Sequence, residues 1–568
     1  MRPTTLVSAA LVSLILPAAA GAQDTTHFTH ADTLRGDINA PGRAWWDAEF
    51  YDLHVAVNPA DSSVSGWNAI TYRVVSAPRE MQLDLREPIA IDSVVQDGRH
   101  VAARRDSNAF FVRLPDAGRV GGRGTVTVYF HGRPRVAHHA PWDGGVVWTR
   151  DSLGNTYVAS AVEGFGASGW WPLKDTEADE PDSQRVAITI PDPIIDVSNG
   201  RLRSVTHHPD HTTTWEWFVT NPINSYDVAL NAGSYTHFGW IYEGENGPLT
   251  MDFWPLAYHR QAAEQQFKQA NAMMSCFEHW FGPYPWYRDG YKLVETPHLG
   301  MEHQSAVAYG NRYQNGYLGT DLSGTGLGLL WDFIIVHESA HEWWGNSLTS
   351  KDHADMWIHE SFANYAEAIY TECRFGKEAG AKYQIGSRKR VRNDKPIVGH
   401  FGVNDEGSGD MYYKGGNMLH TIRQLVNDDE KWRGILRGLQ STFRHQTVTG
   451  KQVEDYISQQ AGMDLSPVFA EYLTTTMIPS LEYRVENGTL AYRWTDVVPN
   501  FAMPVRVTLG GSTLTRGGST VVEGGDSVVL HPTAQWQTMP TTIRDASQLH
   551  VDENYYVTAR PVSSVPQA

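Results

Sequence analysis

Apolar and polar positions alternate along the N-terminal part of the chain. Apolar residues occupy every second position over 53–57 and again over 70–74, and Gly, Pro, Asn and Asp cluster between such runs. Alternation of this kind predicts short β-strands joined by turns. We therefore expect an N-terminal β domain over residues 23–240, folded as a β-saddle or β-sandwich.

The spacing of apolar residues becomes helical near residue 255 and stays so to about residue 478. We expect a mainly helical domain over residues 241–478. Gly376 is expected to end its third helix, and Gly415-Gly416 to lie at a junction between loop and helix. The predicted helices cover Gln261–Phe281, Gly328–Trp344, Asp355–Phe375, Asn417–Asn427 and Gln452–Gln460.

Alternation returns in the last part of the chain. Leu481, Tyr483 and Val485 alternate with polar residues, and Asn487-Gly488 follows them as a hairpin turn signal. We expect a small C-terminal β-sandwich over residues 479–568. The fold class predicted for the whole chain is a multidomain α+β protein.

Composition limits the possible functions. The chain has 568 residues, 41% of them hydrophobic and 19% charged, and a net charge of −18. Because single cores stop growing near ~250–300 residues, we expect about two to four domains. An acidic surface disfavours nucleic acid and mildly favours cationic ligands, such as the N-terminal ammonium of a peptide. The simpler interpretation is that the charge keeps the protein soluble.

The N-terminus has the three parts of a secretory signal peptide. Met1-Arg2 is positive, Leu6–Leu16 is mostly apolar, and Ala20-Gly21-Ala22 forms an A-x-A cleavage pattern. We expect residues 1–22 to be a signal peptide and the protein to be exported, to the periplasm or the medium. The apolar run is short for a bilayer, which needs ~20 residues, so no membrane span is expected in the mature chain.

Two cysteines are present, Cys276 and Cys373. An oxidising compartment permits a disulfide between them, but sequence separation does not show whether they meet. Two buried free thiols are an equally good interpretation.

The segment from Val336 to Glu342 contains the motif HExxH. His337 and His341 are one helical turn apart, so both imidazoles face the same side and can bind one zinc ion. Glu338 points elsewhere and can reach a metal-bound water. The alternative is a pair of hydrogen-bonded histidines on a buried helix.

A third ligand strengthens the metal hypothesis. Catalytic zinc sites usually take three protein ligands and leave one position for water. Glu360 follows His341 by 19 positions. Gly345-Asn346 ends the first helix, and a second helix that begins near Asp355 can fold back to bring Glu360 to the metal.

These motifs resemble those of the gluzincin aminopeptidase family, which includes aminopeptidase N and leukotriene hydrolase. HExxH followed by a Glu with 18 residues in between is the family's signature. The segment from His341 to Asn346 is similar to its H-x-W-F-G-N, and that from Trp357 to Ala363 to its W-L-N-E-G-F-A. His359 and Ser361 depart from the latter. The resemblance implies a thermolysin-like catalytic domain with one Zn²⁺ ion.

Gly300-Met301-Glu302-His303 resembles the family's G-x-M-E-N segment, whose Glu binds the α-amine of the substrate. The resemblance therefore implies that Gly300, Met301 and Glu302 bind substrate. A carboxylate near the zinc can hold an ammonium by a charge-assisted hydrogen bond. His303 and Leu299 depart from the family pattern, which leaves the substrate preference open.

Tyr412-Tyr413-Lys414-Gly415 resembles the family's Y-E-K-G, whose Tyr steadies the tetrahedral intermediate. Aligning Lys414-Gly415 selects Tyr412, with Tyr413 as the alternative. A phenol suits the role because it is neutral at pH 7 and can donate to an oxyanion. Glu163, just before Gly164-Phe165, falls near the position of a substrate-lining Gln or Glu.

The prediction is a zinc aminopeptidase that acts on peptides with a free N-terminus. Glu338 serves as the general base and Tyr412 as the oxyanion donor. Asp355 is expected to hydrogen-bond a ligand histidine, with Glu342 as its rival. The alternatives are a zinc endopeptidase, an epoxide hydrolase on the same scaffold, or a binding protein without catalysis.

Overall fold

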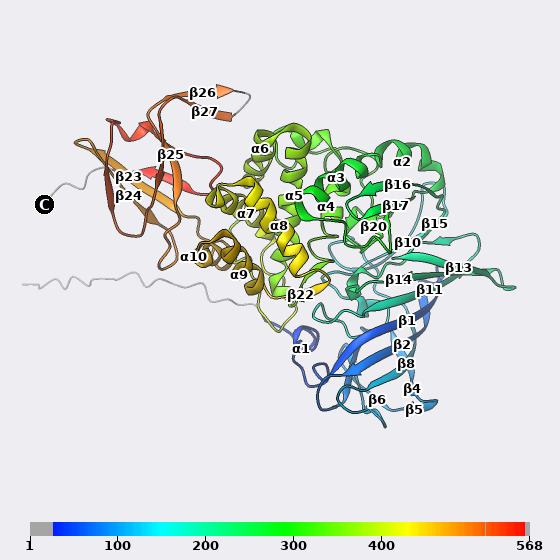
Figure 1. Ribbon diagram of the computed structural model, residues 1–568. Helices are drawn as coiled ribbons and strands as arrows, with labels where there is room; N and C mark the ends of the chain where they lie inside the picture. The colour runs from blue at the N-terminus through cyan, green and yellow to red at the C-terminus, as the bar shows by residue number, and fades with distance from the viewer. Residues whose placement is uncertain (1–26, 517–518, 563–568) are drawn as a thin grey trace, which may run out of the picture.

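The computed structural model describes residues 27–516 and 519–562. The predicted signal peptide, residues 1–22, lies outside this described part. A β-rich region, a largely helical region and a second set of strands follow one another along the chain (Figure 1). The multidomain α+β organisation is thus confirmed at the level of its β-rich and helical parts.

An eight-stranded sheet forms the framework of the N-terminal region, in the order β13-β14-β11-β1-β2-β8-β4-β5. Neighbours are antiparallel except β1 and β11, which run parallel. The alternating apolar side chains at 53–57 and 70–74 are buried in its core. The strands are β1 (Trp46–Asn58), β2 (Ser63–Val74), β4 (Ala90–Gln96), β5 (Arg99–Val101), β8 (Arg123–Gly132), β11 (Ser183–Pro191), β13 (Arg201–His207) and β14 (Thr212–Val219).

Two smaller sheets complete this region. One has the order β3-β7-β6 and the other β12-β15-β10-β9. β10 ends two residues before Glu163 and so carries the chain toward the helical region. The strands are β3 (Met81–Asp84), β6 (Ala103–Asp106), β7 (Ala109–Val112), β9 (Gly145–Arg150), β10 (Thr156–Ala161), β12 (Ile195–Asp196) and β15 (Asn231–Gly233), and one helix, α1 (His30–Gly36), precedes them.

The central region packs helices around a five-stranded sheet of order β16-β17-β18-β20-β19. Its strands are β16 (Phe238–Gly244), β17 (Gly247–Trp254), β18 (Tyr291–Glu295), β19 (Gly300–Met301) and β20 (Val307–Tyr309). Its helices are α2 (Arg260–Gln266), α3 (Gln269–Phe281), α4 (Phe333–Ala340), α5 (Trp357–Phe375), α6 (Lys377–Ser387), α7 (Tyr413–Val426), α8 (Asp429–Thr442), α9 (Gly450–Ala461) and α10 (Ser466–Thr474). A short pair, β21 (Leu348–Ser350) and β22 (Gln446–Val448), lies among them.

Two predicted helices differ from the observed ones. The helix expected over 261–281 is divided into α2 and α3. The helix expected from Gly328 begins only at Phe333, because the Asp332 carboxylate caps the amides of Ile334 and Ile335. It ends at Ala340, with His341 still in helical geometry at the cap.

Gly415 and Gly416 lie inside the first turn of α7, so their predicted place at a junction is wrong by a few residues. The reason is close packing between α7 and α5. A side chain at either glycine would collide with Ser361 or Asn364 on α5. This close approach carries Tyr412 to the end of α5 that bears Glu360.

The C-terminal strands form sets of order β29-β24-β23-β31 and β28-β25-β30, with a hairpin β26-β27 beside them. Asn487 and Gly488 both have positive φ, 49° and 75°, and link the paired residues Glu486 and Thr489, which confirms the predicted turn. The strands are β23 (Ser480–Glu486), β24 (Thr489–Thr495), β25 (Val505–Leu509), β26 (Ser512–Arg516), β27 (Ser519–Glu523), β28 (Asp526–Leu530), β29 (Gln537–Pro540), β30 (Leu549–Val551) and β31 (Thr558–Pro561).

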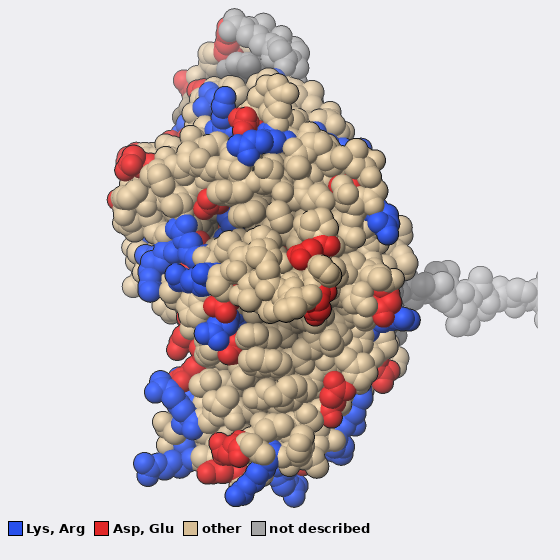
Figure 2. Space-filling model, turned by 90° about the vertical axis from the view of Figure 1, so that its right-hand side faces the viewer, with Lys and Arg blue, Asp and Glu red and all other residues tan. Residues whose placement is uncertain are grey.

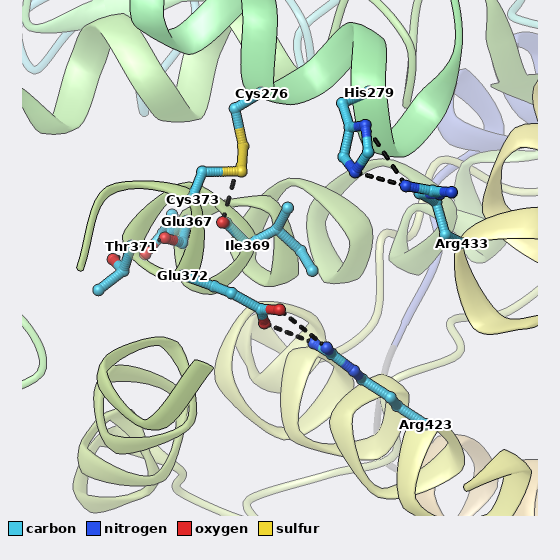
Figure 3. The surroundings of a disulfide bond; sticks show 9 residues. All are labelled: Cys276, His279, Glu367, Ile369, Thr371, Glu372, Cys373, Arg423 and Arg433. Atoms are coloured by element: carbon cyan, nitrogen blue, oxygen red, sulfur yellow. Dashed lines mark hydrogen bonds and ion pairs between the residues drawn. A yellow bond between two sulfur atoms is a disulfide. The ribbon is translucent and has the colours of Figure 1, made fainter. Parts of the chain in front are cut away.

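Cys276 on α3 and Cys373 on α5 are joined in a disulfide, with Cα atoms 6.1 Å apart (Figure 3). The alternative of two free thiols is therefore wrong. The bond fastens the last turn of α5 to α3, and Glu372 beside it receives two hydrogen bonds from Arg423 on α7.

Charges are mixed on the surface. Acidic and basic side chains are interspersed over the face shown in Figure 2, so the net charge is not gathered there as one patch. No helix of the described residues has both the length and the apolar composition needed to cross a membrane.

Candidate metal centre and active site

Helices α4 and α5 bring the three predicted ligands together. His337 and His341 project from the same side of α4, with ring centroids 5.1 Å apart. The Oε2 atom of Glu360 on α5 lies 3.4 Å from His337 Nε2 and 3.5 Å from His341 Nε2. All three ligand atoms lie within 4.8 Å of one another and are buried.

The donor set fits a zinc ion. Zinc binds imidazole nitrogen and carboxylate oxygen at ~2.0–2.2 Å, and catalytic sites use three such ligands. Glu360 Oε2 is buried and makes no hydrogen bond to any described residue, which is a costly state for a carboxylate oxygen. An ion held between Glu360, His337 and His341 would satisfy this atom. The three residues therefore suit one Zn²⁺ ion.

The Nδ1 atoms of both histidines also have polar partners. His337 Nδ1 lies 2.9 Å from Glu367 Oε1, and His341 Nδ1 lies 2.9 Å from the carbonyl oxygen of Trp344. Such contacts fix the orientation of the rings and leave each Nε2 free for a metal. Glu367 thus orients His337, a role that the sequence predicted for Asp355 or Glu342.

The expectation for Asp355 and for its rival Glu342 is wrong. The Asp355 carboxylate accepts from the Gly450 amide at 2.7 Å and from the Trp357 indole at 3.3 Å. Asp355 precedes α5 and faces the start of α9, so it fixes two elements rather than a ligand. Glu342 accepts from the Ser305 amide and the Tyr284 hydroxyl and does not line the cavity.

Glu338 lies in the cavity beside the ligands. Burial raises the pKa of its carboxyl to about 7, with His337 lowering it and Glu302 raising it. A carboxyl with a pKa near neutrality can accept a proton from water and then return it. Gly300 on β19 leaves room for this group, because a Cβ atom there would lie 2.8 Å from Glu338 Oε1.

Two carboxylates form an anionic corner of the cavity. Glu302 is buried and accepts a hydrogen bond from the Tyr226 hydroxyl at 3.1 Å. Burial raises the pKa of Glu163 well above its usual range, and the charges of Glu302 and Glu360 add to this. Glu163 Oε1 is buried and has no hydrogen-bond partner in the part of the chain that the structure describes. A cation placed at this corner would relieve both carboxylates.

Tyr412 contacts two of the three predicted metal ligands. Its hydroxyl donates to Glu360 Oε1 at 2.7 Å, and its ring stacks on that of His337 with centroids 5.9 Å apart. Tyr413 lines the same cavity, with its ring centroid 6.3 Å from that of Tyr412. Only Tyr412 of the two hydrogen-bonds a ligand within the described residues.

One cavity of about 420 Å³ holds the site. Its lining includes every site residue predicted from the sequence, namely Glu163, Gly300, Met301, Glu302, His337, Glu338, His341, Glu360 and Tyr412. His303 is absent from the lining and is fully buried, and neither of its ring nitrogens hydrogen-bonds a described residue. His303, which departs from the family pattern, therefore lies behind the cavity wall.

Three residues at the site were missed by the sequence reasoning: Glu367, Tyr226 and Arg390. Glu367 carried a signal, because it lies two helical turns after Glu360 on the same face of α5. Tyr226 and Arg390 come from distant segments of the chain, and no local pattern marks them.

Comparison with known proteins agrees with this geometry. Residues 266–472 match the model of the peptidase family M1 domain. Aminopeptidase N of Lactococcus lactis is 22% identical over 470 residues, which is 78% of this chain and 52% of that protein. Aminopeptidase N of Streptomyces lividans is 25% identical over 294 residues, 48% of this chain and 33% of that protein.

Solved structures share the fold. A two-domain M1 zinc metallopeptidase mutant bound to L-tryptophan superposes with a TM-score of 0.66 at 21% identity, covering 77% of this chain and 96% of that one. A mutant of the M1 zinc metallopeptidase from Deinococcus radiodurans, bound to a Tyr-Ser-Ala substrate, gives 0.65 over the same shares.

The chain spans about half, or less, of the length of the first curated relatives that it matches. The match nevertheless covers the helical region that carries the HExxH motif, Glu360 and Tyr412. Residues 266–472 therefore form a peptidase family M1 domain, and the chain is similar to aminopeptidases N and to M1 zinc metallopeptidases over much of its length.

Proposed function

We propose that the protein is a zinc aminopeptidase that removes N-terminal residues from peptides. The observation that carries the proposal is the anionic corner of Glu302 and Glu163 in the same cavity as His337, His341 and Glu360. A carboxylate pair beside the metal ligands holds a free ammonium one residue away from the bond to be cut.

Each residue then has a defined part in the reaction. A bound zinc ion supplies a Lewis acid that acidifies water and polarises the peptide carbonyl. Glu338 takes a proton from the attacking water and passes it to the leaving amine. The Tyr412 hydroxyl donates a hydrogen bond to the oxyanion as it develops. Glu302 and Glu163 hold the N-terminal ammonium and so fix which bond is cut.

The alternatives explain fewer features. An endopeptidase has no need of buried carboxylates at the end of its cleft, and a binding protein has no need of Glu338 beside a complete ligand set. A lipid epoxide offers no ammonium for Glu302. The matched relatives are named as aminopeptidases, which favours the same choice.

The test is hydrolysis of a panel of aminoacyl-arylamides by the zinc-loaded protein, with and without a chelator. We expect turnover that chelation abolishes and zinc restores, and none of the N-acetylated analogues. Equal turnover of acetylated substrates would indicate an endopeptidase. No turnover of any substrate would indicate a binding protein.

We also propose that the protein is exported, to the periplasm or the medium, after cleavage behind Ala22. The sequence of residues 1–22 supports this proposal, and so does the disulfide between Cys276 and Cys373, because disulfides persist in oxidising compartments. The N-terminal sequence of protein recovered from the periplasm or the medium tests it. A mature chain that begins at Met1 would contradict it.

For the domain organisation we propose a β-saddle or sandwich over 23–240, a thermolysin-like domain over 241–478 and a small β-sandwich over 479–568. The two C-terminal strand sets support the last of these. Limited proteolysis should cut near residues 240 and 478, and early cuts inside these ranges would count against the division.

A further inference from the structure

Arg390 is unusual in the cavity because of its charge. Among the described residues that line the cavity it is the one Lys or Arg, beside six glutamates. It ends a short turn, Arg388–Arg390, that follows α6. Nothing in the proposed reaction uses it.

The guanidinium group of Arg390 has unused hydrogen-bond donors. Its Nε donates to the carbonyl oxygen of Leu322 at 2.8 Å, and its Cζ lies 5.9 Å from the ring centroid of Tyr413. Within the described part of the chain no carboxylate lies within 4.0 Å of it. The two terminal nitrogens therefore have no anionic partner in a half-buried position.

Arg390 and the anionic corner have different neighbours in the cavity. Its neighbours are Leu322 and Tyr413. Tyr413 follows Tyr412, whose hydroxyl binds Glu360. Glu302, by contrast, is held by Tyr226 from the N-terminal region. The cavity thus holds the metal ligands, a carboxylate corner and a guanidinium group with separate neighbours.

A peptide bound across the metal ligands carries opposite charges at its two ends. When its ammonium is held at Glu302, its C-terminus can extend past the ligands to Arg390, which lines the same cavity. Each extended residue spans ~3.3–3.6 Å, so two to four residues reach ~7–14 Å. An unpaired guanidinium fork matches a carboxylate through two parallel hydrogen bonds.

We propose that Arg390 binds the C-terminal carboxylate of short peptides, so that the preferred substrates are peptides of two to four residues with both ends free. This proposal rests on the aminopeptidase function proposed above. It adds a binding residue at the end of the substrate opposite the cut.

The test compares pairs of peptides that differ only at the C-terminus. The best N-terminal residue from the arylamide panel is extended by one to three glycines, and each peptide is made as a free acid and as an amide. At the preferred length we expect kcat/KM for the acid to exceed that for the amide by about 10- to 100-fold. In Arg390→Met this ratio should fall below about three, mainly through KM of the acid.

Lys389→Met is the matched control. Lys389 is the exposed neighbour of Arg390, it carries the same charge and it does not line the cavity. Its removal should leave the ratio as in the wild type. A wild-type ratio below about three at every length, or a ratio that survives Arg390→Met, would overturn the proposal. If Arg390→Met does not fold, a wild-type ratio below about three still overturns the proposal.

Binding separates this proposal from the proposed function. Calorimetric titration of Glu338→Gln with the same acid and amide pairs requires no turnover. Tighter binding of the acid in that variant supports the role of Arg390 even if no peptide is hydrolysed, in which case only the aminopeptidase function fails. Equal binding of acid and amide counts against Arg390.

Discussion

At the scale of single residues, the site depends on which atoms have partners. Glu360 Oε2 is buried without a hydrogen bond, whereas Glu360 Oε1 already receives one from Tyr412. Glu367 and the Trp344 carbonyl occupy the far nitrogens of the two histidines. The atoms left free are those that a metal would use.

Glu367 should affect metal affinity although it is not a ligand. Glu367→Gln weakens the contact that orients His337, and we expect zinc to bind about 10- to 100-fold more weakly. Competition with a chromophoric chelator measures this. Asp355→Asn is the control, because among the described residues the Asp355 carboxylate hydrogen-bonds only Gly450 and Trp357. Equal affinity in the two variants would contradict the role of Glu367.

Glu302 should matter most for substrates with a free amine. Glu302→Gln removes the negative charge but keeps an acceptor for the Tyr226 hydroxyl. We expect kcat/KM for aminoacyl-arylamides to fall about 10- to 100-fold, the value of one charge-assisted contact. Substrates whose amine is replaced by hydrogen should be affected far less, and equal losses on both would refute the assignment.

The residues that the sequence predicted are those in contiguous motifs. HExxH fixes the positions of His337, Glu338 and His341 through helix geometry alone. Asp355 was assigned wrongly because closeness in sequence to Glu360 does not determine which way a side chain points. Tyr226 could not be found, since its contact with Glu302 exists only once two regions have folded together.

At the scale of elements, the site depends on how closely α5 approaches its neighbours. The glycines of α7 allow contact with Ser361 and Asn364 on α5. The apolar periodicity predicted α5, and the Asn487-Gly488 dipeptide predicted the hairpin turn. The periodicity did not predict that α4 would start at Phe333, because that start depends on the Asp332 side chain capping the helix. Periodicity describes faces of elements, whereas capping decides their ends.

The disulfide between α3 and α5 should stabilise the fold. It closes a chain segment whose ends are 97 residues apart. Restricting the unfolded chain in this way contributes about 2–4 kcal/mol. Replacing Cys276 and Cys373 together by Ser should lower the free energy of unfolding by this amount in denaturant titrations. Equal stability of the wild type with and without a reductant would contradict the prediction.

At the scale of the whole molecule, the C-terminal strands dock on the helical region. Their apolar side chains join its core. His420 on α7 contacts Asn554 at 2.9 Å, and the Tyr472 hydroxyl of α10 donates to the carbonyl oxygen of Tyr556. The sequence predicted the order of the three regions. It contained no pattern for the surfaces between them, because each contact joins residues far apart in the chain.

This docking should weaken in acid through His420. Burial lowers the pKa of its imidazole to about 4, below the usual 6.5. In the unfolded chain this imidazole therefore binds a proton below about pH 6.5, whereas in the folded chain it binds the proton only near pH 4. This group's contribution is complete above pH 6.5 and is lost as the pH falls, by about 2 kcal/mol between pH 7 and pH 5.

Denaturant titrations of the metal-free protein at pH 7 and pH 5 measure this loss. His420→Gln keeps a donor for Asn554 and should lose about 2 kcal/mol less than the wild type on acidification. His100→Gln, at an exposed position, should behave as the wild type. An identical loss in both variants would show that His420 does not contribute.

The central claim is that His337, His341 and Glu360 hold a zinc ion beside which Glu338 acts as the base. The most direct measurement is the zinc content and arylamide turnover of the wild type and Glu338→Gln, side by side. We predict one zinc ion per chain in both and a rate about 100- to 10,000-fold lower in the variant. Undiminished turnover in Glu338→Gln, or a wild-type protein that turns over substrate without zinc, would contradict the account.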